Sequence, residues 1–269
     1  MQGISRASLA AATERVEPLL GGADAARLGE DLFAVAAVLD SSAGLRRALT
    51  DPSRDGDAKA DLVGRLLDGK VSDGCVDLVS GMARDRWSRA RDLADACEEL
   101  GAVAVLGSAE AAGDLDAVED ELFRYGRVVA ANRELRSALG DRSRSAADKA
   151  ELVETLLESK VRPQTLVLAR QASTAPRGRR VEDVLESFGE AAAHRRERLV
   201  ARVTAAVPLT SSQRDRLVQV LQRVYDRTMH LDVDLDPELL GGLRVQVGDE
   251  VIDASVLSRL DEARRRLAG

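Results

Sequence analysis

The sequence predicts a mainly α-helical fold: two tandem helical bundles, the second a duplicate of the first, followed by a small α/β domain. Three observations lead to this fold class. Aromatic residues make up 2% and charged residues 32% of the 269 residues, which favours helices packed through Leu, Val and Ala. A long segment recurs along the chain, and near the end the apolar spacing changes from helical to period two.

The internal repeat aligns the segment that starts at Leu32 with the one that starts at Leu122, an offset of 90 residues (122 − 32) without a gap. Solenoid repeats span only about 20 to 50 residues, so this period indicates one duplicated helical domain instead. We expect the first copy over residues 1–101, the second over 102–197 and the α/β domain over 198–269. Identical pairs at this offset include Leu45/Leu135, Leu49/Leu139, Lys59/Lys149, Leu62/Leu152 and Val71/Val161.

The first copy begins with a helix whose apolar residues recur at spacings of three and four. We expect Ser5 to cap this helix and Gly21-Gly22 to stop it. A second helix is predicted over Leu32–Leu39. Asp51-Pro52 then interrupts the chain, because the residue before a proline avoids the helical region. The apolar face of the first helix holds Leu9, Ala12, Val16 and Leu19.

Three further helices complete the first copy. Asp57 is the expected cap of the next helix, and Gly69 is its expected end. The other two helices are predicted over Val76–Met82 and Leu93–Leu100. Only Gly101 interrupts the apolar stripe that follows, so we expect the last helix of the first copy to run into the first helix of the second.

The second copy repeats this pattern with its own signals. Ser145 is followed three residues later by Asp148, which predicts a capping box at the start of a helix. The copy ends in a helical segment over residues 181–199 with a basic exit.

The C-terminal domain is predicted to run strand, helix, strand, strand, helix, which indicates a small sheet with helices packed on it. Alternating apolar residues place the strands at 203–207, 231–235 and 243–247, and Gly241-Gly242 supplies a turn. Gly248-Asp249 punctuates the chain after the last of these strands, and Val251-Ile252 runs on into Asp253.

Two helices belong to this domain. Thr210 and Gln213 form a capping-box pattern before a helix through residues 217–224. Ser255 can cap the last helix. The apolar face of this last helix holds Val256, Leu260, Ala263 and Leu267.

Composition and charge disfavour several classes of protein. The net charge is −7 and the pI about 5.1, whereas a general nucleic-acid binder is normally basic. No run of about 18 apolar residues exists, so we expect no membrane span. The first residues contain Glu14 and lack an apolar core, so no signal peptide is expected. Cys75 and Cys97 lie far apart without a metal spacing, which predicts reduced thiols in a cytosolic compartment.

Residues for chemistry are scarce, and we expect no catalytic, cofactor-binding or metal-binding residue. The chain has no GxxxxGK[ST] loop for nucleotide phosphates. His194 and His230 have no second ligand at a metal spacing, which favours a solvated or capping role. This scarcity favours an interaction protein over an enzyme, although an enzyme with a cleft between the helical copies stays an alternative.

Two other features have alternative interpretations. Asp232, Asp234 and Asp236 share one strand face without the glycine and glutamate of an EF-hand, so a solvent face is favoured over a cation site. Trp87, the only tryptophan, is an interface anchor or, more often, part of a small bundle's core.

The stretch DPELLGGLRVQVGDEVIDAS, followed by an amphipathic helix, resembles the C-terminal signature of the F-type ATP synthase delta subunit family, whose mitochondrial relative is the oligomycin-sensitivity-conferring protein. The usual pattern has glycine where this chain has Ala254. VTAAVPLT with SSQRDRLVQVLQRVY resembles the family's entry to its C-terminal part. SRASLAAATERV and GMARDRWSRARDLADACEEL resemble its helical domain. The duplicated bundle is similar to a long, actinobacterial-type form.

This resemblance implies a non-catalytic subunit of the peripheral stalk, associated with the cytoplasmic side of the cell membrane. In the family, the helical bundle receives the N-terminal helices of the head's alpha subunits, and the C-terminal part engages the membrane-anchored b subunit. The head is thereby held static during rotary ATP synthesis. A helical scaffold of another cytosolic complex is the alternative.

The mode of recognition implied is a helix bound in a groove. Alanine leaves room for an incoming helix and methionine adapts to its shape, but the same residues would form the core of any bundle. The candidate contacts for alpha are Leu9, Ala12, Val16, Val76, Val79 and Met82. The candidate contacts for b are Leu257, Leu260 and Leu267.

Overall fold

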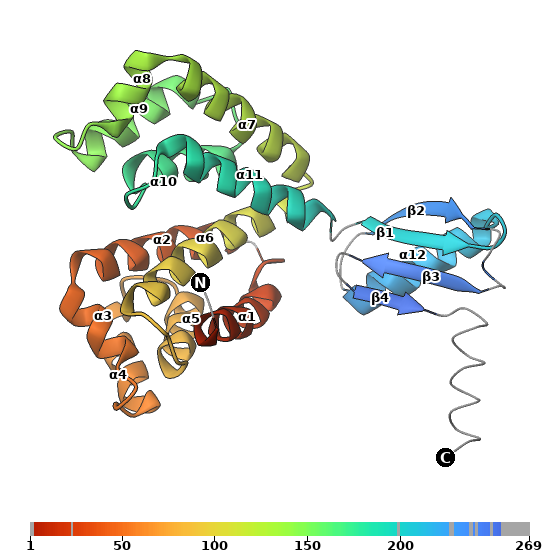
Figure 1. The fold of residues 1–269 in the computed structure, drawn as a ribbon, viewed down its shortest axis with the longest axis horizontal. Coiled ribbons are helices and arrows are strands. Elements are labelled where there is room, and N and C mark those ends of the chain that lie inside the picture. The colour runs from red at the N-terminus through yellow and green to blue at the C-terminus, as the bar shows by residue number, and fades with distance from the viewer. Residues whose placement is uncertain are drawn as a thin grey trace. The chain divides into compact units, whose positions relative to one another are not determined.

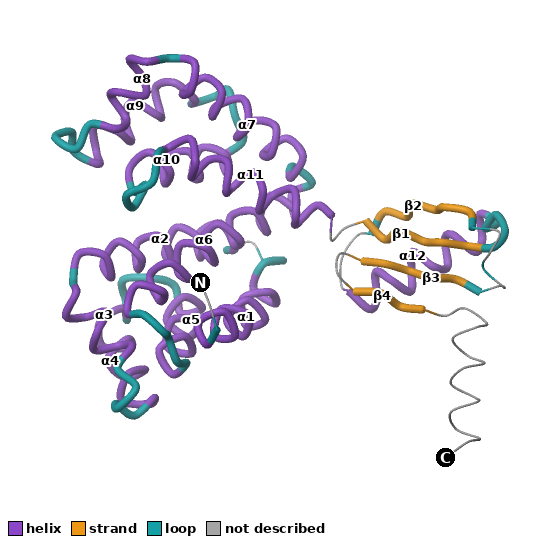
Figure 2. Tube along the Cα trace, in the orientation of Figure 1, coloured by secondary structure: helices purple, strands orange, loops and turns teal. Residues whose placement is uncertain are grey.

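A computed structural model describes residues 3–22, 24–197, 200–225, 229–236, 239, 242–247 and 250–253. The chain divides into two compact units, Met1–Ala192 and Ala193–Gly269. The first is helical and the second contains a sheet (Figures 1 and 2). The predicted fold class, helical bundles followed by a small α/β region, is confirmed.

The helical unit consists of helices joined by short connections. Those of the first copy are α1 (Ile4–Val16), the 3-10 turn η1 (Glu17–Leu19), α2 (Ala25–Ser41), α3 (Ala43–Thr50), α4 (Gly56–Leu67), α5 (Asp73–Arg84) and α6 (Ala90–Ala112). Those that follow are α7 (Leu115–Ala131), α8 (Arg133–Gly140), α9 (Ala146–Leu157), α10 (Pro163–Thr174) and α11 (Val181–Glu197).

The duplication is visible in the helix bounds. Adding 90 to the bounds of α2, α3, α4 and α5 gives the bounds of α7, α8, α9 and α10 without error. The local signals are repeated too: Ser42 accepts a hydrogen bond from the Leu45 amide at the start of α3, and Asn132 accepts one from the Leu135 amide at the start of α8. The two copies therefore repeat both the helix bounds and this helix cap.

Helix α6 belongs to both copies (yellow in Figure 1). It is continuous through Gly101 and ends at Gly113, which has a left-handed φ of 74°. The prediction that the last helix of the first copy runs into the second is confirmed. The position expected for the boundary between the copies, residues 101 and 102, lies inside this helix.

Three predicted helix signals in the first copy are wrong. Helix α1 begins at Ile4, and Ser5 is a buried residue within it rather than its cap. The helix ends at Val16 instead of at Gly21-Gly22, because Pro18 has no amide hydrogen to continue it.

The third concerns α4. Asp55 caps it by accepting hydrogen bonds from the amides of Asp57 and Ala58, because its backbone is the extended one that an N-cap requires. Asp57 is already helical. The capping box at Ser145 and Asp148 is confirmed.

The first copy has a core of Leu, Val, Ala and Met side chains. Trp87 is buried in it, and its Nε1 donates to the Met82 carbonyl oxygen at 2.8 Å. Cys75 and Cys97 are fully buried in the same core, and burial raises the pKa of the Cys75 thiol to about 12. Of the two interpretations of Trp87, the core residue is confirmed.

The C-terminal unit is a four-stranded sheet in the order β2-β1-β3-β4. Its elements are β1 (Val200–Ala205), α12 (Ser211–Tyr225), β2 (His230–Leu235), β3 (Leu243–Val247) and β4 (Glu250–Asp253). Strands β1 and β2 are parallel, with α12 as the crossover between them, and the other pairs are antiparallel. The capping box at Thr210 and Gln213 is confirmed.

Helix α12 lies against one face of the sheet (Figure 2). Its Leu221 packs in one core cluster with Ala201, Val203 and Val245. Residues 251–252 form a separate fourth strand, which pairs Ile252 with Val245. This strand was not predicted as an element of its own. The predicted helix after Ser255 lies outside the residues that the structure describes.

Candidate partner-binding surfaces

The residues predicted to contact alpha lie mostly inside the first bundle. Val79 is buried, and so is Met82. Leu9 and Val76 are half-buried at the edge of the core. Only Leu9 and Val76 of the six present area that a docked helix could cover. Ala12 and Val16 are also fully buried, and Leu257, Leu260 and Leu267 lie outside the described residues.

Polar ties that the sequence did not reveal hold α1 in place. The Ser5 hydroxyl donates to Asp92 at 2.6 Å and accepts from the Ser88 amide at 2.8 Å. The Ser8 hydroxyl donates to the Arg86 carbonyl oxygen at 2.6 Å. Serines at helical spacing look like a solvent face, so only the fold shows that they point into the connection between α5 and α6.

An ion pair closes the end of α1. Arg15 donates to both carboxylate oxygens of Asp85, at 2.7 and 3.0 Å, and this hydrogen bonding raises the pKa of the guanidinium. Two exposed apolar residues flank the helix: Ile4 at its first position, and Leu19 in η1 just after its end. Helix α1 therefore keeps a partly solvent-facing surface with an apolar residue at its start and another just beyond its end.

The corresponding helix of the second copy is more enclosed. At the offset of 90 its residues are 94–106 of α6, and all of them are buried or half-buried except Glu99, the counterpart of Leu9. A Cβ atom on Gly29 of α2 would lie 2.5 Å from Val105 Cγ2, and one on Gly101 would lie 2.8 Å from the Phe33 ring. Val105 occupies the position that corresponds to Arg15. Helix α2 of the first copy thus covers the first helix of the second.

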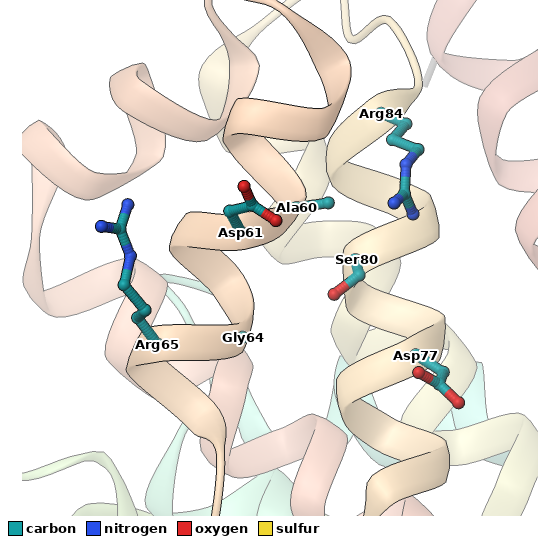
Figure 3. Close-up of a pocket in the computed structure, with 7 residues that line it drawn as sticks. All are labelled: Ala60, Asp61, Gly64, Arg65, Asp77, Ser80 and Arg84. Atoms are coloured by element: carbon teal, nitrogen blue, oxygen red, sulfur yellow. The ribbon is translucent and has the colours of Figure 1, made fainter.

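A shallow hollow of about 470 Å³ lies between α4 and α5 (Figure 3). Ser80 points from α5 toward α4, and Arg84 is paired with Asp57 at 2.9 Å. The hollow offers charges of both signs and no apolar anchor. In the second copy the residues at the positions of Gly64 and Ser80 are Glu154 and Arg170, which pair at 3.4 Å. The hollow is lined by Ala60, Asp61, Gly64, Arg65, Asp77, Ser80 and Arg84.

The C-terminal unit exposes apolar residues on α12. Val224 is 64% exposed and Val220 45%, one turn apart. Within the helix predicted through residues 217–224, Leu221 is buried in the core and Leu217 is half-buried against it, whereas these two valines are exposed. At the end of α12, Tyr225 donates a hydrogen bond to Glu250 of the edge strand β4 at 2.8 Å. Burial and this hydrogen bond together raise the pKa of Tyr225 to about 12.

The acidic face of β2 lies away from α12. Asp232 and Asp234 are exposed, as a solvent face requires, and Asp232 lies beside Arg202 of β1. Among the described residues, no group of His, Cys, Asp and Glu side chains is arranged to hold a metal ion. His194 is exposed on α11. Across the same described ranges, no helix is long and apolar enough to cross a membrane.

The fold and these surfaces define a class of protein: a duplicated helical bundle with a small α/β unit, whose exposed features are those of an interaction protein. A family model described as ATP synthase delta (OSCP) subunit matches residues 101–267, more than half of the chain. The matched range holds most of the second copy and the C-terminal unit, and the first copy lies outside it.

Relatives match over the whole length. The chain is 53% identical to ATP synthase subunit delta of Kineococcus radiotolerans, over 99% of this chain and 98% of that protein. It is 54% identical to the subunit of Beutenbergia cavernae, over 100% of both, and 52% identical to that of Streptomyces coelicolor, over 100% and 98%. A chain of the Toxoplasma gondii mitochondrial ATP synthase hexamer matches 62% of this chain and 95% of its own length, with 20% identity and a TM-score of 0.32, too low to bear on the fold.

The chain therefore belongs to the ATP synthase delta (OSCP) subunit family. It is a peripheral-stalk subunit of the F-type ATP synthase. The full-length matches decide against a scaffold of an unrelated complex.

Proposed function

We propose that this subunit is a non-catalytic adaptor that links the catalytic head to the membrane-anchored b subunit on the cytoplasmic side of the cell membrane. Its working parts are the first copy (1–101), the second copy (102–197) and the C-terminal domain (198–269). In this role the subunit needs surfaces for partner helices and enough total affinity to resist torque.

The contact with the alpha subunit falls on the first copy. The observation that carries this assignment is the difference between the two first helices: α1 keeps a partly exposed surface, whereas residues 94–106 of α6, apart from Glu99, are buried or half-buried, with α2 packed against Gly101 and Val105. A partner helix docked against α1 would cover Leu9, and Val76 of α5 is the other predicted contact with remaining exposed area. The buried residues of the predicted set then support the surface from below.

The contact with b falls on the C-terminal unit. Exposed Val220 and Val224 form an apolar stripe on α12 of the kind that an amphipathic helix covers. The predicted helix with Leu257, Leu260 and Leu267 is the second candidate surface. Both are in the part of the chain that the family model matches.

Calorimetric titration with a synthetic peptide of the alpha subunit's N-terminal helix tests the first contact. We expect saturable binding to the wild-type chain and its loss in Leu9→Asp, because a buried carboxylate at the contact costs more than the contact supplies. The matched control is Val128→Asp, the same change at an exposed position of α7 in the second copy.

Circular dichroism establishes that each variant is folded. Binding that survives Leu9→Asp but is lost in Val128→Asp would move the contact to the second copy. A folded wild-type chain that neither binds the peptide nor co-purifies with alpha and beta subunits would contradict the adaptor function.

A further inference from the structure

We propose that the connection between α10 and α11, residues 175–180, is an ionic clamp that locks the second helical copy onto the first, so that the two copies form one rigid arm. The inference concerns the subunit's mechanics and does not depend on which helices it binds.

Arg177 is the centre of the clamp. Its side chain is 5% exposed, and its guanidinium reaches three carboxylates of the first copy. Nε lies 2.5 Å from Asp40 at the end of α2, Nη2 lies 2.7 Å from Asp95, and Nη1 lies 3.1 Å from Glu98. Asp95 and Glu98 belong to the first half of α6. All three guanidinium nitrogens of a second-copy residue are therefore engaged by the first copy.

A second layer of contacts reinforces this centre. Arg179 Nη2 lies 2.6 Å from the other oxygen of Glu98, and Arg91 donates to the Arg177 carbonyl oxygen at 2.9 Å. Glu98 is buried and pairs with two of the three arginines of the connection, Arg177 and Arg179. Burial opposes the charge of Arg177, but the hydrogen bond to Asp40 and the charges of Glu98 and Asp95 outweigh it and raise the pKa of the guanidinium. The clamp stays charged.

The backbone of the connection is shaped for this reach. Arg177 has a φ of 54° and Gly178 a φ of 84°. A long side chain rarely adopts the left-handed region, so the ion pairs must hold Arg177 there. The turn closes with a hydrogen bond of 3.0 Å from the Arg179 amide to the Pro176 carbonyl oxygen.

Comparison of the two copies shows that the clamp is a specific feature of the second. The residue 90 positions before Arg177 is Trp87, which is buried in the core of its own bundle. The same connection closes its own bundle in the first copy and reaches across to the neighbouring bundle in the second. The two copies therefore differ in function at this connection, although their backbones are duplicated.

Two more contacts join α2 of the first copy to helices of the second copy. The rings of Phe33 and Phe188 have centroids 6.4 Å apart, and Arg170 lies 3.3 Å from Glu30. Together with Asp40 they tie the second copy to α2 at three positions, which span about 15 Å along the helix. Because the copies also share the continuous helix α6, a hinge through α6 would have to break all three ties.

Spin-label distance measurements on the full chain test the clamp. Asp61→Cys on α4 and Glu151→Cys on α9 place one label on each copy at exposed, equivalent positions, and the native cysteines are fully buried. We expect a narrow distance distribution for the wild-type arm. Arg177→Ala should broaden the distribution and shift its mean. The matched control is Arg180→Ala, which removes the same charge from the same connection but breaks only a pair with Asp183 of its own helix.

Arg180→Ala should retain the wild-type distribution. An unchanged distribution in folded Arg177→Ala would overturn the proposal, and so would equal broadening in both variants. If Arg177→Ala loses its helical circular dichroism, Asp40→Asn replaces it as the test. This milder variant weakens only the pair between Arg177 and Asp40, whose carboxylate is partly exposed. A distribution in Asp40→Asn as narrow as the wild type's would then overturn the clamp, and broadening would support it.

Discussion

Gly29 and Gly64 both lie within helices of the first copy, yet they respond differently to an added methyl group. On Gly29 of α2 the new Cβ would meet Val105 Cγ2 at 2.5 Å and the Gly101 carbonyl oxygen at 2.7 Å, so α2 and α6 would have to separate. On Gly64 of α4 nothing lies within 4 Å. The same substitution thus probes the contact between α2 and α6 at one position and helix propensity alone at the other.

We expect Gly29→Ala to lower the free energy of unfolding by about 1–3 kcal/mol, the usual cost of overpacking. Gly64→Ala should raise it by about 0.5–1 kcal/mol, because alanine loses less backbone entropy in a helix. Urea unfolding followed by far-ultraviolet circular dichroism measures both. Stabilisation by Gly29→Ala would show that α2 and α6 are not in close contact.

At the scale of single elements, the helix starts can be checked directly. Ser145 caps α9 and is part of a capping box, so Ser145→Ala should cost about 1 kcal/mol of unfolding free energy. The exposed neighbour Arg144 provides the control, since Arg144→Ala leaves the cap intact. Equal midpoints of urea unfolding for the two variants would mean that the box contributes nothing to α9.

The elements also show what a sequence can predict. Caps at Ser145 and Thr210 were predicted correctly because a capping box requires two residues at a fixed spacing. Asp57 was chosen wrongly because Asp55, two positions earlier, is an equally good cap, and only backbone geometry separates them. Strand β4 was missed as an element because Glu250–Asp253 is too short to show an alternation.

Contacts between elements were beyond the sequence. Arg177 lies in the stretch PRGRR, which has the composition of a solvated turn, and its three carboxylate partners are 79 to 137 positions away. The sequence also did not show that most of the predicted contacts for alpha are buried within their own bundle. Apolar spacing shows which face of a helix is covered, but not whether its own bundle or a partner covers it.

At the scale of the whole molecule, the two units should separate in function. Deleting residues 198–269 removes the sheet and leaves the helical unit with its own core. We expect the truncated chain to remain bound to the head while the head detaches from the membrane. ATP hydrolysis by the purified head should stay at the wild-type rate if the subunit is the non-catalytic adaptor proposed above.

Hydrolysis assays on washed membranes and on the released fraction measure this outcome, and re-addition of the full-length chain is the control. A purified head with the truncated chain that hydrolyses ATP more slowly than the wild-type head would contradict a purely mechanical role.

Helix α6 also has a consequence for how such a subunit can change in length. It ends one bundle and begins the next, and α11 is the helix that stands in its place at the end of the second copy. A further copy inserted after α11 would therefore continue that helix into the new bundle, as α6 continues from the first bundle into the second. Each added copy would bring another 90 residues with the same order of helices. The shared helix makes the bundle a building block that evolution or an engineer can repeat, so the reach of the stalk could be set by the number of copies.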